Sequence, residues 1–167
     1  DAPANGDYPP ESGWAAFPDG AGATATGSGA FALADGATAT GFNATATGSN
    51  SLANGSSAEA SGESSIAIGG QVDAFDGNPI TVNTVASGLG ATAVGSGSLA
   101  SALGSSSFGV LSEASGEASS AFGYGSTATG SYASSFGHAS GATGDYSVAV
   151  RGPAHLIPGF CFLGYTQ

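Results

Sequence analysis

GATATGFNATATGSNSLANG, residues 36–55, returns a glycine every seven residues, at Gly41, Gly48 and Gly55, with an alanine two positions before each one. Positions two residues apart share one face of an extended strand, whereas a helix would scatter them around its circumference. The spacing therefore predicts short β-strands that carry only small side chains on one face. Such a face lets two layers of backbone approach closely, with alanine methyls between them and glycine where the chain bends.

The seven-residue unit extends over most of the chain. With its glycine as position 0, it runs through residues 27–69 and again through residues 88–151. Of these 17 places 14 hold Gly, and the position two before is Ala in 15 cases, the exceptions being Ser107 and Ser135. The two residues after each glycine are the expected corners, so two strands and two corners make one coil. We predict an all-β fold, a flattened parallel β-roll (solenoid) of 14-residue coils stacked about 4.8 Å apart.

The composition excludes several function classes. The 167 residues hold 12 acidic side chains and one basic side chain, Arg151, for a formal charge of −11. This deficit removes the basic footprint that a nucleic-acid phosphate backbone or an anionic lipid surface requires. No apolar run approaches the roughly 20 residues that span a bilayer. We expect neither nucleic acid nor membrane contact, and the single Cys161 excludes an internal disulfide framework.

An apolar stripe predicts self-association. In the second run of repeats, every other unit carries valine or phenylalanine immediately before the glycine, and the intervening units carry serine or threonine there. A roll filled with alanine has no interior space for phenylalanine, so another chain is expected to cover the stripe, and the monomer alone is expected to be unstable. The candidate residues for this contact are Ile66, Ile68, Val94, Phe108, Phe122, Phe136, Val148 and Val150.

The two runs of repeats are separated by a break. Between them lies QVDAFDGNPITVNT, residues 71–84, in which Val72 and Ala74 alternate before a DGNP turn and Ile80 and Val82 alternate after it. This pattern predicts a β-hairpin insertion at about residues 70–87, the alternative being an irregular loop. Because projections on rigid scaffolds often carry function, the hairpin supplies the first candidate ligand contacts, Phe75, Asp76 and Asn78.

The stretch SSAEASGE (residues 56–63) followed by SSIAIGGQ (residues 64–71) resembles the head repeat of trimeric autotransporter adhesins, the YadA-like heads of Gram-negative outer membranes. The resemblance covers residues 20–152. It implies a left-handed β-roll on each chain of a homotrimer, with inner strands facing the trimer axis. It also implies a non-enzymatic head that binds host extracellular matrix or cell surfaces, or itself, and that is anchored in the outer membrane by other parts. Residues 1–19 would be a Pro-rich lead-in and residues 153–167 a tail.

Catalytic and metal-binding patterns do not occur. There is no G-x-S-x-G elbow, and the two histidines are His138, expected at a solvated corner, and His155, outside the repeat. The acidic residues do not recur in the frame of a calcium-binding roll, and no lysine is present for a phosphate-binding loop. We expect no enzyme activity, catalytic residue, metal or cofactor.

Two further functions compete with adhesion. One is a structural spacer within a surface fibre. The other is a monomeric ice-binding solenoid, suggested by T-x-T pairs such as Thr38/Thr40, although the column that contains them passes to Leu52 and Asn54. Tyr132 and Tyr146 share a corner position one predicted coil apart, so they are expected to stack on one edge as a second candidate for ligand contact or as part of a subunit boundary.

Overall fold

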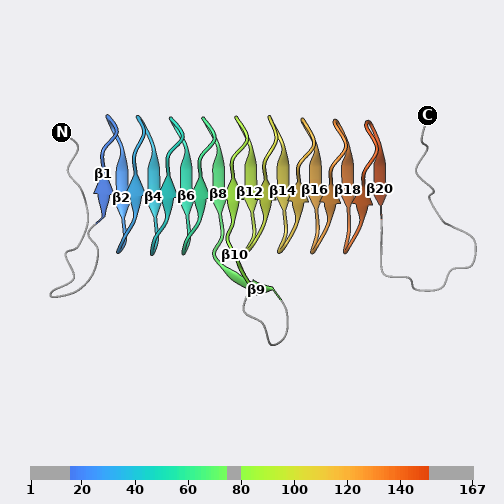
Figure 1. The fold of residues 1–167 in the computed structure, drawn as a ribbon, viewed down its shortest axis with the longest axis horizontal. Coiled ribbons are helices and arrows are strands. Elements are labelled where there is room, and N and C mark those ends of the chain that lie inside the picture. Colours follow the sequence, from blue (N-terminus) through green and yellow to red (C-terminus); the bar gives the residue numbers. More distant parts are fainter. Residues whose placement is uncertain (1–15, 75–79, 151–167) are drawn as a thin grey trace, which may run out of the picture.

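The computed structural model describes residues 16–74 and 80–150, and these residues form a parallel β-solenoid without any helix. Two nine-stranded parallel sheets lie back to back, and the chain alternates between them, so that each coil contributes one strand to each sheet. Figure 1 shows the coils stacked along the long axis, with the first and last strands, β1 (Phe17–Pro18) and β20 (Val148–Val150), at opposite ends of the stack.

The two sheets differ in strand length. Sheet A holds two-residue strands, in the order β1 (Phe17–Pro18), β3 (Phe31–Ala32), β5 (Thr45–Ala46), β7 (Glu59–Ala60), β11 (Val85–Ala86), β13 (Leu99–Ala100), β15 (Glu113–Ala114), β17 (Thr127–Ala128) and β19 (Gly141–Ala142). Sheet B holds three-residue strands, in the order β2 (Thr24–Thr26), β4 (Thr38–Thr40), β6 (Leu52–Asn54), β8 (Ile66–Ile68), β12 (Thr92–Val94), β14 (Ser106–Phe108), β16 (Ser120–Phe122), β18 (Ser134–Phe136) and β20 (Val148–Val150).

The coil has the predicted length of two seven-residue units. Thr24 pairs with Thr38, and Thr38 pairs with Leu52, so each strand lies beside its counterpart in the next coil. Identical positions of successive coils therefore stack in columns that run along the solenoid. A residue type that recurs in every second seven-residue unit therefore forms a continuous column on one face of the solenoid.

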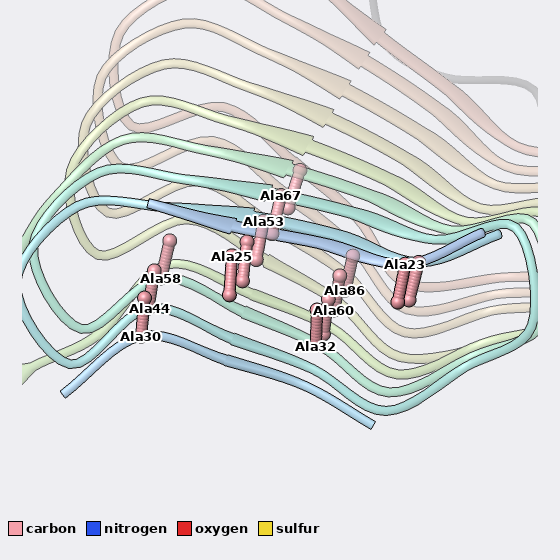
Figure 2. Close-up of a cluster of buried hydrophobic side chains, with 14 of the residues drawn as sticks. Ala23, Ala25, Ala30, Ala32, Ala44, Ala53, Ala58, Ala60, Ala67 and Ala86 are labelled. Atoms are coloured by element: carbon pink, nitrogen blue, oxygen red, sulfur yellow. The ribbon is translucent and has the colours of Figure 1, made fainter. Parts of the chain in front are cut away.

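Alanine methyls fill the space between the two sheets. The inward alanines at the centres of the sheet B strands, such as Ala25 and Ala53, are completely buried in all coils but the last, and Figure 2 shows Ala25, Ala53 and Ala67 in a row from coil to coil. Ser107 and Ser135, which replace alanine at two of these positions, are equally buried. Their hydroxyls bond to Ser112 and Ser140 across the interior, each over 2.6 Å. The serine that replaces alanine is thus matched by a second serine that faces it.

The glycines that come directly before the corners differ in backbone conformation between the two sheets. All eight that follow strands of sheet B adopt φ between 111° and 153°, a region that L side chains avoid, whereas none of those that follow sheet A has positive φ. At Gly109, for example, φ is 132° and an added Cβ would lie 2.5 Å from the carbonyl oxygen of Gly123 in the next coil. The two alanines that replace corner glycines, Ala34 and Ala102, both follow sheet A, where no positive φ is required.

The break between the repeats contains the predicted hairpin strands. Strand β9 (Val72–Ala74) pairs antiparallel with β10 (Ile80–Val82), and the pair projects from one edge of the solenoid (Figure 1). The coils on either side of it pair directly, since β11 joins β7 and β12 joins β8 without loss of register. The hairpin is therefore an excursion from a corner, and the solenoid is continuous beneath it.

Candidate functional site

The outer face of sheet B carries a column of large apolar side chains. The last residues of its strands from β8 to β20 stack from coil to coil. We name this column the apolar ladder, and it consists of Ile68, Val94, Phe108, Phe122, Phe136 and Val150. The rings of Phe108 and Phe122 lie 4.9 Å apart at 1°, and those of Phe122 and Phe136 lie 5.2 Å apart at 5°. The three rings form one parallel stack, a geometry that rigid neighbouring strands impose.

Nothing in the described part of the chain covers the apolar ladder. The strands of sheet B contact only their neighbours in the stack and the adjoining strands of sheet A. Ile68, Phe136 and Val150 remain 39%, 41% and 64% exposed, while Phe108 and Phe122 are half-buried. A continuous, partly exposed apolar column of this kind is typical of an interaction surface.

The ladder occupies only part of sheet B. In the coils before Ile68 the same column holds Thr26, Thr40 and Asn54. The neighbouring column includes two further predicted contact residues, Ile66, which is half-buried, and Val148, which is 55% exposed. All eight predicted residues thus lie on the outer face of one sheet, and the large apolar side chains gather in the coils from β8 onward.

The threonine pairs do not form a flat array. Thr38 pairs with Leu52 and Thr40 with Asn54, so the pairs of β2 and β4 are interrupted within two coils. On sheet A, Thr127 lies between Glu113 and Gly141. These interruptions remove the regular hydroxyl lattice that motivated the ice-binding alternative.

One edge of the solenoid carries the predicted tyrosine pair. The rings of Tyr132 and Tyr146 stack 5.0 Å apart at 10°, and both residues adopt left-handed backbone angles, with φ of 58° and 57°. On the opposite edge, the edge of the hairpin, the rings of Tyr124 and His138 lie 5.4 Å apart at 8°. His138 is exposed, as expected. Its stacking on Tyr124 is not predicted from the sequence, although the two residues are one coil length apart and equivalent positions of successive coils stack.

The hairpin base packs on neighbouring corners. A Cβ added at Gly97 would lie 2.6 Å from Val72, 2.9 Å from Leu111 and 3.4 Å from Val82, so these three side chains converge over the glycine. Both hairpin strands thus rest against the corners of the following coils. The other predicted ligand contacts, Phe75, Asp76 and Asn78, lie outside the described residues.

Within residues 16–74 and 80–150, no group of three or more His, Cys, Asp or Glu side chains is placed to hold a metal ion. The same part of the chain contains no helix that is long and apolar enough to cross a membrane. What the geometry offers is extended, regular surface, which suits contact with macromolecules.

A comparison with protein families agrees with this arrangement. The family model described as the YadA head domain repeat matches the chain at residues 19–44, 46–71, 82–98, 86–112, 100–126, 114–137 and 128–150. The matched segments follow the coils and leave out residues 72–81, which hold most of the hairpin. A search of curated proteins gives no match.

Proposed function

Because this chain belongs to the YadA head domain family, we propose that it is the passenger head of a trimeric autotransporter adhesin, exposed on a Gram-negative cell surface. Three copies associate through the outer faces of their B sheets. Other parts of the protein hold the head in the outer membrane, and the head attaches the cell to host extracellular matrix, to host cells or to other heads.

The observation that carries this proposal is the apolar ladder. Full burial of one phenylalanine is worth on the order of 1.5–3 kcal/mol, and each chain supplies Phe108, Phe122 and Phe136 in one partly exposed stack. The interior contributes mainly alanine, which removes far less apolar surface per residue from water. Association through the ladder is therefore a major source of stability for the head.

Attachment by such a head relies on repeated weak contacts. With the B sheets turned to the axis, the A sheets of the three chains face outward, and each ligand contact is present three times. Linked sites bind a multivalent surface far more tightly than one site does, because the later contacts form at high effective concentration. The projecting hairpin and the Tyr132–Tyr146 stack are candidate contacts.

The first experiment is the solution mass of the chain by sedimentation or light scattering. The trimer predicts three times 15.6 kDa. Phe122→Ser, in the middle of the ladder, is expected to lower the mass or unfold the chain, whereas Phe31→Ser on sheet A is the matched control and should leave the trimer intact. A stable folded monomer of the natural sequence would refute the trimeric head.

Attachment itself needs a separate measurement. The trimer is tested for binding to immobilised extracellular-matrix proteins and to cultured cells, and for association between beads that carry it. Retention on any of these surfaces supports an attachment head. A trimer that binds none of them would instead support the alternative of a structural spacer in the fibre.

A further inference from the structure

Two copies of one short sequence lie close together on sheet A. The sequence EASGE occurs at residues 59–63 and again, far along the chain, at residues 113–117. In the solenoid only two coils separate them, because β7, β11, β13 and β15 are consecutive strands of sheet A. The intervening coils contribute VASGL at residues 85–89 and LASAL at residues 99–103. Glutamates therefore stand where the two central coils have valine or leucine.

These four coils form a patch with an apolar centre and acidic ends. In its centre Val85 pairs with Leu99 on the sheet, and Leu89 and Leu103 lie at the adjoining corners, 52% and 49% exposed. One end is Glu59 with Glu63, and the other end is Glu113 with Glu117; the first of each pair is partly exposed and the second is exposed. We name these eight residues the Glu–Leu patch.

Basic side chains are too few in this chain to neutralise the glutamates of the patch. The sole lysine or arginine in 167 residues is Arg151, so the chain cannot neutralise four carboxylates of its own. A second copy of the patch would bring glutamate against glutamate, which is unfavourable. Charge complementarity therefore requires a different, basic partner, while the exposed leucines require an apolar group between its charges.

The spacing of the patch fits an extended polypeptide. Three steps of about 4.8 Å separate the two glutamate pairs, which gives about 14 Å along the solenoid. An extended chain advances about 3.4 Å per residue, so residues four apart span the same length, and residues at positions one, three and five of a strand share one face. A segment of the form Lys-x-Leu-x-Lys would place its lysines on the two acidic ends and its leucine on the aliphatic centre.

We propose that the Glu–Leu patch binds an extended basic segment of a partner protein, with two basic side chains four residues apart and an aliphatic side chain between them. The inference rests on the proposed function, because association through sheet B leaves sheet A on the outside of the trimer. It gives that function a partner chemistry and a site, which the fold alone does not.

The test uses the whole chain in solution and an immobilised peptide, Gly-Lys-Ala-Leu-Ala-Lys-Gly, with a control peptide of the same composition whose lysines are adjacent. We expect retention on the first peptide, at least fivefold weaker retention on the second, and weakening of both by salt. Glu63→Gln with Glu117→Gln should raise the apparent Kd about tenfold, since each exposed ion pair contributes up to about fivefold and the contacts are repeated.

Two variants separate the patch from general charge attraction. Asp19→Asn with Asp145→Asn removes the same charge from exposed positions outside the patch, and it should change the apparent Kd less than twofold. Leu89→Ser with Leu103→Ser keeps every charge and should weaken binding severalfold, with the salt dependence retained. Far-UV circular dichroism confirms that each variant is folded.

Three results would overturn the proposal. They are no retention of the natural chain on the first peptide, equal retention on the two peptides, or an equal loss of affinity in the double variant of Glu63 and Glu117 and in that of Asp19 and Asp145. The solution mass distinguishes these failures from failure of the proposed function. A trimer that does not bind the peptide would refute binding by the Glu–Leu patch and would not affect the proposal of an adhesin head. A folded monomer that binds the peptide would refute only the proposed trimer.

Discussion

At the scale of single residues, the interior contains two kinds of buried serine. The Ser112 hydroxyl donates to the carbonyl of Gly109 over 2.8 Å and accepts a hydrogen bond from Ser107. The hydroxyls of Ser51, Ser65, Ser119 and Ser147 find no hydrogen-bond partner among the described residues. A buried hydroxyl without a partner loses its hydration without compensation, so the two kinds should respond oppositely to the removal of one oxygen.

Ser65→Ala is expected to leave the free energy of unfolding unchanged or to raise it by about 1 kcal/mol. The equivalent residue of the next coil is already an alanine, Ala91, and it is completely buried. Ser112→Ala is expected to lower it by about 1–2 kcal/mol, because it removes two hydrogen bonds and leaves Ser107 unpaired. Urea unfolding at one protein concentration compares the two variants. Equal effects would show that the hydroxyl pairs do not stabilise the interior.

Backbone angles at the corners give a second prediction. The second residue of each regular corner is left-handed, and nine of these residues are not glycine, with φ between 50° and 58°. Ala118 is an exposed example with φ of 50°. Ala118→Gly should raise the melting temperature by about 1–2 °C, because relief of about 1 kcal/mol of strain outweighs the added freedom of the unfolded chain.

The matched control for this change is Ala102→Gly, at a residue whose own φ is not positive. There the substitution relieves no strain and adds freedom to the unfolded chain, so the melting temperature should fall. Differential scanning calorimetry measures both variants. A fall at both positions would mean that the corners tolerate left-handed alanine without strain.

The repeat predicts small residues at every inward position, and the structure confirms this. It does not predict which small residue stands where. Ala102 is tolerated because its own φ is not positive, and Ser107 is tolerated because Ser112 faces it across the interior. Both reasons depend on the difference between the two sheets and on contacts across them, which a count along one strand does not contain.

At the scale of elements, the hairpin is separable from the solenoid. Residues 70–83 take the place of one corner, whereas each of the remaining corners consists of two residues. The neighbouring coils nevertheless pair in register. Replacement of residues 70–83 by Ser-Gly, the corner sequence of Ser96 and Gly97, should preserve the far-UV circular dichroism spectrum and the solution mass. The melting temperature should fall by only a few degrees, because Leu111 loses its contact with Val72 and Val82.

A second variant repairs that loss. Leu111 is left-handed, and Asn43 occupies the equivalent corner position two coils before the hairpin. Leu111→Asn in the shortened chain should restore part of the stability, since it removes an exposed leucine and suits the left-handed angle. Unfolding of the shortened chain despite this repair would show that the hairpin is part of the folding unit. Loss of matrix binding from a folded, shortened trimer would assign the ligand contact to the hairpin.

The hairpin also explains what a search for periodicity misses. Its strands follow from the alternation of Val72, Ala74, Ile80 and Val82, and the structure confirms their pairing. By adding residues to one corner, however, it shifts the second run of repeats relative to the first. The two EASGE copies are therefore not separated by a whole number of coil lengths in sequence, and their closeness on sheet A becomes visible only when the strand order is known.

At the scale of the whole molecule, the two ends of sheet B differ in chemistry but not in architecture. β4 and β18 are each the second strand from an end of the sheet, and equivalent hydrogen bonds join each of their coils to its inner neighbour, from the Thr38 amide of β4 to Ser51 and from the Ser120 amide of β16 to Ala133, both 2.8 Å. Repeat arrays gain stability from neighbouring units and open from their ends. An isolated chain should therefore open β4 and β18 with similar ease.

Association through the apolar ladder would remove this equivalence. β18 ends in Phe136, within the ladder, whereas β4 ends in Thr40. In a trimer the partner chains bury Phe136, whereas burial of Thr40 would add little stability. Opening of β18 must therefore also separate an apolar contact between chains. Native-state hydrogen exchange should show slower exchange at Ser120 than at Thr38, and Phe122→Ser should bring the two rates together. Equal rates in a confirmed trimer would mean that the chains associate through another surface.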